Sequence, residues 1–273
     1  MHRLIALASI GLLAAGCAVR GPGASSATGA ATAARSTARV GSATPSPAPA
    51  TPTITPSATP RPDPNLLLPD LETLPPFDLV IARQSDRKLL RFSNSLLNSG
   101  AGALEVEGVF NEASGKTAAT QHIYKVDGSL EEHAAGEFIF HPGHNHWHLE
   151  NFALFEVWSL APDGELDAVV AFTDKLSYCL RDDARSDLPD AAPRAVYRQC
   201  NRQVQGISVG WTDTYAFDTQ GQIVDITALA DGTYALRSTV DPANQLRESD
   251  DENNSAVVFI ELTGNRVEII PDK

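Results

Sequence analysis

Four of the seven histidines in this 273-residue chain fall within residues 141–148, which read His-Pro-Gly-His-Asn-His-Trp-His. Side chains two apart on a strand point to one face, so a strand here would align His144, His146 and His148. An all-imidazole site suits copper or zinc, and intrinsic affinity favours Cu(II). Three ligands leave one coordination position for water or substrate, which favours catalysis over a closed structural site. His141 precedes a Pro-Gly turn and need not join the other three.

Two other interpretations of this histidine segment stay open. It is compatible with a solvated loop that takes up metal adventitiously, and with a copper-handling site that carries out no reaction. The spacing does not distinguish redox from hydrolytic chemistry. The purpose of the metal therefore has to come from residues elsewhere in the chain.

The N-terminus has the features of an export signal. A basic start at residues 1–3 precedes an apolar run at residues 4–15, too short to span a bilayer as a mature helix. The run ends in Leu-Ala-Ala-Gly-Cys, which resembles a bacterial lipoprotein cleavage box with Cys17 as the lipidated residue. We therefore predict a signal peptide over residues 1–16 and a lipid-anchored, extracytoplasmic protein of the bacterial cell envelope. A plain secretory peptide with an incidental Cys17 is the alternative.

The cysteine content fits this location. Of three cysteines, lipidation of Cys17 would leave Cys179 and Cys200 as an even pair in an oxidising compartment. We predict a disulfide between them. It would restrain the polar, proline-broken residues 181–198, which we expect to form a long loop.

The segments that must position these residues divide the chain in two. Residues 17–65 are rich in Ala, Ser, Thr, Gly and Pro and have too few apolar side chains to offset the entropy of folding, so we expect a disordered tether. Residues 66–273 form the expected folded domain. Within it, residues 152–158 and 169–172 flank a Pro-Asp-Gly turn and predict a hairpin, a pattern that recurs along the chain. No long stretch has helical periodicity, which predicts an all-β fold, an antiparallel β-sandwich with long connecting loops.

The histidine segment resembles the copper-binding segment of the lysyl oxidase family, in which the last three histidines are the ligands. Two more segments resemble the family in the same order along the chain. Residues 173–180 (Thr-Asp-Lys-Leu-Ser-Tyr-Cys-Leu) are similar to the segment with the cofactor lysine, and residues 205–215, which end in Asp-Thr-Tyr, to the segment with the cofactor tyrosine. Cys179 and Cys200 occupy the positions of a family disulfide. The resemblance covers about residues 68–262.

By this resemblance, Lys175 and Tyr215 would cross-link into lysine tyrosylquinone, the family's built-in cofactor, after copper and oxygen oxidise the phenol. Taken singly, Lys175 would be read as a surface charge and Tyr215 as a core aromatic residue. The sequence departs from animal members at residues 153–155, where Ala-Leu-Phe replaces a further histidine. Neither the sequence nor the resemblance identifies the base that removes the substrate's α-proton.

A second cluster, Glu-Ser-Asp-Asp-Glu-Asn-Asn at residues 248–254, offers hard oxygen ligands of the kind that calcium prefers. In the family a calcium ion joins this loop to the strand at the start of the domain. The resemblance implies the ligand residues Asp70, Leu71, Glu248, Asp250, Asn253 and Asn254. The alternative is an acidic turn exposed to water.

These observations lead to a functional hypothesis. The chain is expected to be a copper-dependent amine oxidase that uses dioxygen to convert peptidyl-lysine or other primary amines to aldehydes, with release of ammonia and hydrogen peroxide. The alternative is a non-catalytic, surface-tethered copper-binding or interaction module on the same scaffold. A net charge of -13 repels nucleic acid and attracts cations such as amines. Membrane contact is expected through the lipid anchor only.

Overall fold

The computed structural model describes residues 63–174 and 176–271. The predicted signal peptide, Cys17, Lys175 and almost all of the expected tether therefore lie outside the described residues. Within these two ranges the chain forms seventeen strands and no helix, so no membrane-spanning helix occurs there. The all-β fold class predicted from the turn and strand pattern is confirmed.

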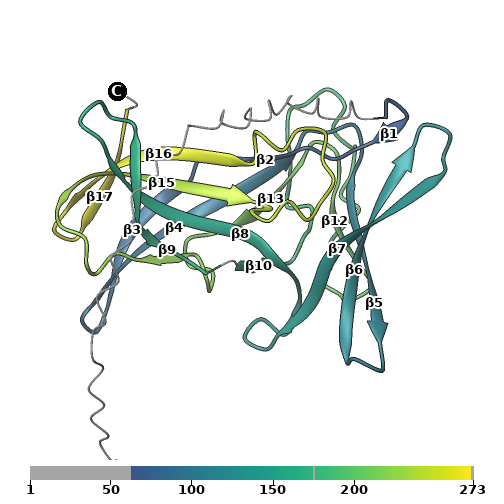
Figure 1. Cartoon of the computed structure of the whole chain (residues 1–273), viewed down its shortest axis with the longest axis horizontal. Helices are drawn as coiled ribbons and strands as arrows, with labels where there is room; N and C mark the ends of the chain where they lie inside the picture. Colours follow the sequence, from purple (N-terminus) through teal and green to yellow (C-terminus); the bar gives the residue numbers. More distant parts are fainter. Residues whose placement is uncertain (1–62, 175, 272–273) are drawn as a thin grey trace, which may run out of the picture. The chain divides into compact units, whose positions relative to one another are not determined.

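Two antiparallel sheets contain these strands (Figure 1). The larger sheet has eleven strands: β1 (Leu66–Leu67), β5 (Leu104–Asn111), β6 (Lys116–Lys125), β7 (Leu130–His141), β8 (His146–Leu160), β9 (Leu166–Phe172), β10 (Leu176–Tyr178), β12 (Val204–Ile207), β15 (Gly232–Val240), β16 (Ser255–Thr263) and β17 (Arg266–Ile270). The smaller sheet has six: β2 (Leu71–Thr73), β3 (Phe77–Gln84), β4 (Arg87–Asn98), β11 (Ala184–Arg185), β13 (Trp211–Tyr215) and β14 (Ile223–Asp225).

The long strand β8 organises the larger sheet, whose main order is β12-β5-β6-β7-β8-β15-β16-β17. Its first residues pair with β7, and its second half pairs with β15 on one side and β9 on the other. The change of partner occurs around Asn151, whose φ of 58° lies in the left-handed region that Asn tolerates better than most residues. Figure 1 shows β8 as a long curved ribbon through the middle of the fold.

The smaller sheet is built on β4, which pairs with β2, β3, β13 and β14. Because β4 is buried along most of its length, its sequence is apolar or small at nearly every position between Leu89 and Leu97. Phe92 of β4 meets Phe155 of β8 edge to face, with ring centroids 4.7 Å apart. This contact lies in the hydrophobic core between the two sheets, as expected of a sandwich.

The predicted hairpin around the Pro-Asp-Gly turn is confirmed as β8 and β9, with Glu156 opposite Phe172. Residues 181–198 are irregular as expected, except that the short strand β11 pairs with β13. The predicted disulfide between Cys179 and Cys200 is confirmed, with the two Cα atoms 5.3 Å apart. It ties the end of β10 to the segment that leads into β12.

Candidate metal centre

Three histidines converge at the junction of β7 and β8. The side chains of His144, His146 and His148 each offer one nitrogen, and these nitrogens lie within 4.8 Å of one another. Such a group can hold a metal ion after small adjustments of the rings, since metal–nitrogen distances are about 2 Å. These are the three residues that the spacing singled out.

The expected geometry of this segment is wrong in one respect. His144 does not lie on the strand, because β8 begins at His146 and residues 142–145 form a turn. The backbone N–H groups of His144 and Asn145 donate to the His141 carbonyl at 3.1 and 2.8 Å, and Asn145 has a φ of 57°. The turn folds His144 back toward the strand. The convergence therefore comes from a turn and a strand together and not from strand alternation alone.

His148 is the buried member of the group, with 2% of its surface exposed. Its Nδ1 lies 3.2 Å from the Ser177 hydroxyl, and its Nε2 lies 3.4 Å from His144 Nδ1. Burial lowers the pKa of His148 to about 3, so the ring is neutral at pH 7. Burial also lowers the pKa of His144 and His146, with a further contribution from neighbouring imidazoles. Neutral imidazole is the form that binds metals.

His141 also lies against this group, although its position before a Pro-Gly turn was no reason to include it. Its ring centroid is 4.3 Å from that of His144 and 5.0 Å from that of His148. Its Nδ1 is buried and has no hydrogen-bond partner among the described residues. The signal that could have found it is the hairpin register, which places His141 directly opposite His146. His141 packs beside the three converging nitrogens but is not one of them.

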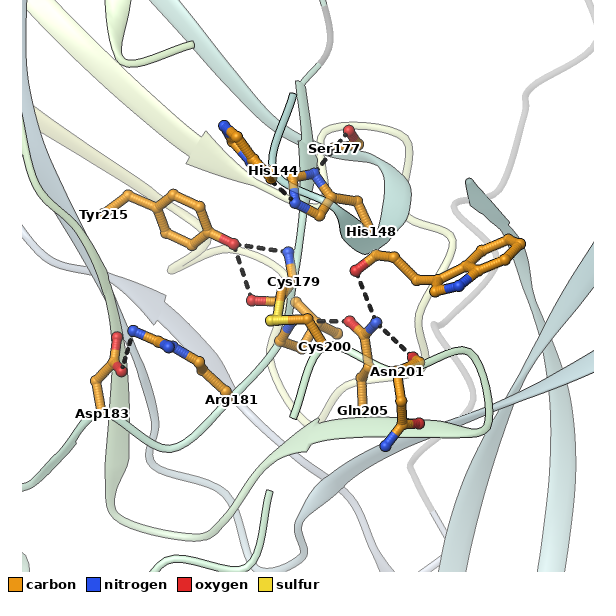
Figure 2. Close-up of a disulfide and its surroundings, with 12 residues drawn as sticks. His144, His148, Ser177, Cys179, Arg181, Asp183, Cys200, Asn201, Gln205 and Tyr215 are labelled. Atoms are coloured by element: carbon orange, nitrogen blue, oxygen red, sulfur yellow. Dashed lines mark hydrogen bonds and ion pairs between the residues drawn. A yellow bond between two sulfur atoms is a disulfide. The ribbon is translucent and has the colours of Figure 1, made fainter. Parts of the chain in front are cut away.

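Tyr215, at the end of β13, lies beside the histidines. Its hydroxyl accepts a hydrogen bond from the Cys179 N–H at 2.6 Å and donates to the Cys179 carbonyl at 2.8 Å. Its ring stacks on Tyr178 with centroids 3.7 Å apart. Figure 2 shows the two hydrogen bonds next to the disulfide, with His144 and His148 nearby. The disulfide-bonded Cys179 therefore holds the phenol in place, and burial raises the pKa of Tyr215.

His144 and Tyr215 both line two pockets. The first, of about 340 Å³, is lined by His144, His146, Cys179, Arg181, Cys200, Asp213, Thr214, Tyr215 and Thr219. The second, of about 300 Å³, is lined by His141, His144, His148, Leu176, Ser177, Tyr178, Tyr215, Gln220, Gly221, Gln222 and Ile223. Lys175 lies outside the described residues, but its two successors, Leu176 and Ser177, line the second pocket. The structure thus brings Tyr215 and the histidines to one site.

The acidic cluster at residues 248–254 meets the start of the domain. Glu248 accepts hydrogen bonds from the Leu71 N–H at 2.6 Å and from the Asn254 amide at 3.0 Å. The Asn253 amide donates to Asp70 at 2.8 Å. The side-chain oxygens of Asn253 and Asn254 are buried and have no hydrogen-bond partner among the described residues. Hydrogen bonds therefore join five of the six predicted calcium-ligand residues in two sets, Leu71 with Glu248 and Asn254, and Asp70 with Asn253.

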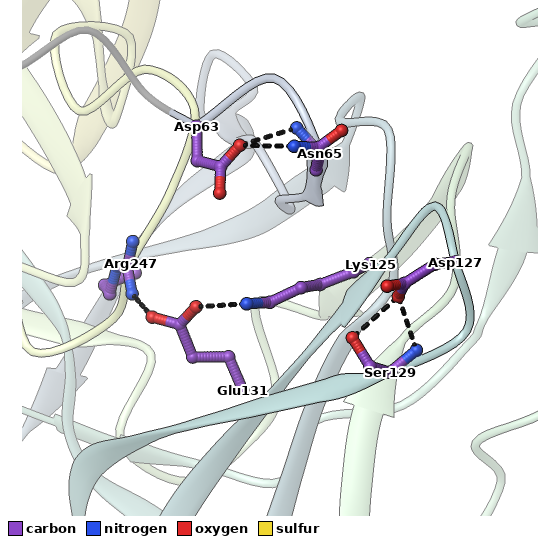
Figure 3. A network of polar contacts seen from close by, with 7 residues as sticks. All are labelled: Asp63, Asn65, Lys125, Asp127, Ser129, Glu131 and Arg247. Atoms are coloured by element: carbon purple, nitrogen blue, oxygen red, sulfur yellow. Dashed lines mark hydrogen bonds and ion pairs between the residues drawn. The ribbon is translucent and has the colours of Figure 1, made fainter.

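The sixth residue, Asp250, accepts a hydrogen bond from the Glu252 N–H at 2.8 Å and lines a pocket together with Glu248. Burial raises the pKa of Glu248 to about 8. Arg247 anchors the same loop through an ion pair with Glu131 at 2.5 Å, and Lys125 pairs with Glu131 at 3.2 Å (Figure 3). The cluster is thus partly buried and held, unlike a freely exposed acidic turn.

Known proteins resemble this chain over most of the region just described. The family model described as lysyl oxidase matches residues 123–271, more than half of the chain. Lysyl oxidase homolog 4 of Mus musculus is 31% identical over 182 residues, which cover 66% of this chain and 20% of that protein. Protein-lysine 6-oxidase of Rattus norvegicus is 32% identical over 129 residues, 46% of this chain and 29% of that protein. The aligned region spans about a fifth of the length of the mouse relative.

Proposed function

This chain belongs to the lysyl oxidase family, and we propose that it is a copper-dependent amine oxidase. In the proposed reaction, peptidyl-lysine or another primary amine, water and dioxygen yield an aldehyde, ammonia and hydrogen peroxide. The observation that carries the proposal is the convergence of three imidazole nitrogens in a site that Tyr215 also lines.

The donor set fits copper. His144, His146 and His148 would hold the ion, because burial lowers the pKa of all three and so favours the neutral imidazole that copper prefers. Ser177 engages Nδ1 of His148 and so fixes the ring with Nε2 toward His144. Copper, when bound, would supply the redox chemistry with dioxygen by which Tyr215 and Lys175 become lysine tyrosylquinone, the carbonyl group that oxidises amines.

The residues around Tyr215 hold it for this chemistry. Tyr178 covers one face of the Tyr215 ring, so a reagent can approach only the opposite face or the ring edge. Two hydrogen bonds to Cys179 fix the phenol oxygen, and the disulfide in turn fixes Cys179. In this proposal Lys175 contributes the amine that adds to the oxidised ring, which requires its neutral form.

A structural calcium ion is the second part of the proposal. The buried side-chain oxygens of Asn253 and Asn254 have no hydrogen-bond partner in the described part of the chain, and an unsatisfied buried oxygen costs free energy, so a donor or a cation would stabilise them. Glu248, Asp250 and the segment at Asp70 and Leu71 would complete an oxygen-rich site. Such an ion would stabilise the contact between the start of the domain and the loop before β16.

The N-terminal sequence supports a lipid-anchored, extracytoplasmic location, which we propose on the sequence alone. An oxidising compartment suits the disulfide between Cys179 and Cys200. The membrane contact would be made by the lipid on Cys17.

The experiment that tests the amine oxidase uses purified protein loaded with copper in air. A redox-cycling quinone stain and amine-dependent peroxide release should both be positive for the wild type and both be lost in Lys175→Ala. Lys116→Ala is the matched control, because Lys116 is an exposed lysine on β6 that pairs with Glu137 of β7 and lines neither of the two pockets. A wild type negative in both assays would leave the non-catalytic copper-binding module as the function.

A further inference from the structure

Asp213 is a buried carboxylate on β13. It lies two residues before Tyr215, so the two side chains leave the strand on the same face. Only 1% of its surface is exposed, and neither carboxylate oxygen forms a hydrogen bond of good geometry with a described residue. Burial of a carboxylate without hydrogen-bond partners is unfavourable, so a functional role would explain its presence.

The position of Asp213 indicates such a role. It lines the same pocket as His144, His146 and Tyr215. Burial is the main cause that raises the pKa of Tyr215 and of Tyr178, and the negative charge of Asp213 adds to both shifts. A substrate bound against an oxidised Tyr215 ring would therefore share a pocket with Asp213.

Within the first pocket, the histidines and the arginine are less suited than Asp213 to accept a proton. His144 and His146 are assigned to the metal, and Arg181 is a permanent cation that pairs with Asp183 at 2.8 Å (Figure 2). Asp183 is also engaged by the Thr214 N–H at 3.0 Å. Among the described residues that line these two pockets, Asp213 is the only carboxylate.

We propose that Asp213 is the catalytic base that removes the α-proton of the bound amine. The assignment rests on the proposed amine oxidase function and adds the proton acceptor that the sequence did not identify. The amine nitrogen first bonds to the quinone carbonyl carbon, whose oxygen leaves as water. The α-carbon–hydrogen bond then breaks, the proton moves to an Asp213 carboxylate oxygen, and the bonding electron pair passes through the nitrogen and reduces the quinone; hydrolysis later releases the aldehyde. The quinone is the oxidant, dioxygen later reoxidises it, and Asp213 returns its proton to water.

Burial gives Asp213 the strength that a base needs. Burial is the main cause that raises its pKa well above the ordinary value, and the charge of Asp183 acts in the same direction while Arg181 opposes it. A higher pKa makes the ionised carboxylate a stronger proton acceptor. The ionised fraction of Asp213 should rise as the pH rises through its raised pKa, and the rate of proton removal should rise with it.

The test separates cofactor formation from proton transfer. Wild type, Asp213→Asn and Asp213→Glu are loaded with copper in air, and phenylhydrazine titration measures the quinone content of each. Anaerobic mixing with benzylamine and with its α,α-dideuterated form then measures the rate at which the quinone is reduced. The control is Asp218→Asn, which removes the same charge from an exposed turn after β13.

We expect Asp213→Asn to bind phenylhydrazine like the wild type but to be reduced by amine about 10²- to 10⁴-fold more slowly. Its rate should also lose the rise with pH, and Asp213→Glu should recover part of both. Asp218→Asn should match the wild type. An Asp213→Asn protein reduced at the wild-type rate, or one that forms no quinone while Asp218→Asn does, would overturn the assignment of Asp213 alone. A wild type that binds no phenylhydrazine would overturn the amine oxidase proposal with it.

Discussion

In the absence of divalent cations, the free energy of unfolding should fall as the pH rises, because Glu248 is buried and its ionisation is unfavourable in the folded chain. Only 8% of its surface is exposed. Burial raises its pKa from 4.5 to about 8, and the charges of Asp241 and Asp251 add to the shift against the hydrogen bonds from Asn254 and Leu71. The perturbation to test is therefore a chelator, a pH series, and the substitution Glu248→Gln.

The sign and size follow from proton linkage. Between pH 4.5 and about 8 the folded chain keeps a proton on Glu248 that the unfolded chain has lost. The stabilisation is present in full below pH 4.5 and is lost as the pH rises through about 8. Since one pKa unit corresponds to about 1.4 kcal/mol, complete ionisation of Glu248 should lower the free energy of unfolding by about 5 kcal/mol.

Urea unfolding followed by tryptophan fluorescence in EGTA, at several pH values from about 5 to about 9, measures this slope. Other buried acids such as Asp213 contribute in the same direction, so the informative quantity is the difference between wild type and Glu248→Gln. Glutamine keeps the size of the side chain and carries no charge at any pH. The slope of the wild type should therefore be steeper than that of the variant.

Calcium should reverse the loss, since the ionised carboxylate is the form that binds it. At a calcium concentration of one hundred times Kd the gain is about 2.7 kcal/mol, and it should be larger at high pH than at low pH. Glu248→Gln should gain less. Equal pH slopes for wild type and variant in EGTA would refute the linkage argument, and an equal calcium response would refute the placement of the ion.

Two further predictions concern the metal centre and its support. Substitution of both Cys179 and Cys200 by serine should lower the free energy of unfolding by about 3 kcal/mol, the value expected for a closed loop of this size. Urea unfolding without reductant measures the change. A loss below about 1 kcal/mol would contradict the prediction. Ser177→Ala should weaken copper binding about 10- to 100-fold in a chelator competition, because the His148 ring loses its contact with the Ser177 hydroxyl. An unchanged copper affinity would show that packing alone orients the ring.

Local patterns were sufficient for much of the fold. The strand-like run at residues 152–158, the Pro-Asp-Gly turn and the run at residues 169–172 predicted the β8–β9 hairpin, since strand propensity and turn chemistry depend on neighbours in sequence. The spacing of His144, His146 and His148 identified the metal-binding candidates. Parity of the cysteines predicted the bridge from Cys179 to Cys200.

Local patterns failed where a property depends on residues far away. His144 reaches the site through a turn with Asn145 in a left-handed conformation, and His141 joins the cluster only through the β7–β8 register. Neither geometry follows from counting residues, because a period of two holds only while the strand continues.

The sequence by itself determined which residue types could carry out chemistry: a histidine triplet, a tyrosine and lysine in characteristic segments, and a carboxylate-rich loop. The tertiary structure alone decided which of them are buried and face one another. Nothing in the sequence distinguishes Asp213 from the other acidic residues. In the structure β13 pairs with β4, more than a hundred residues earlier in the chain, and the Asp213 carboxylate is buried in the pocket that Tyr215 lines. Burial and convergence are products of long-range pairing, and the reactivity of these groups depends on both.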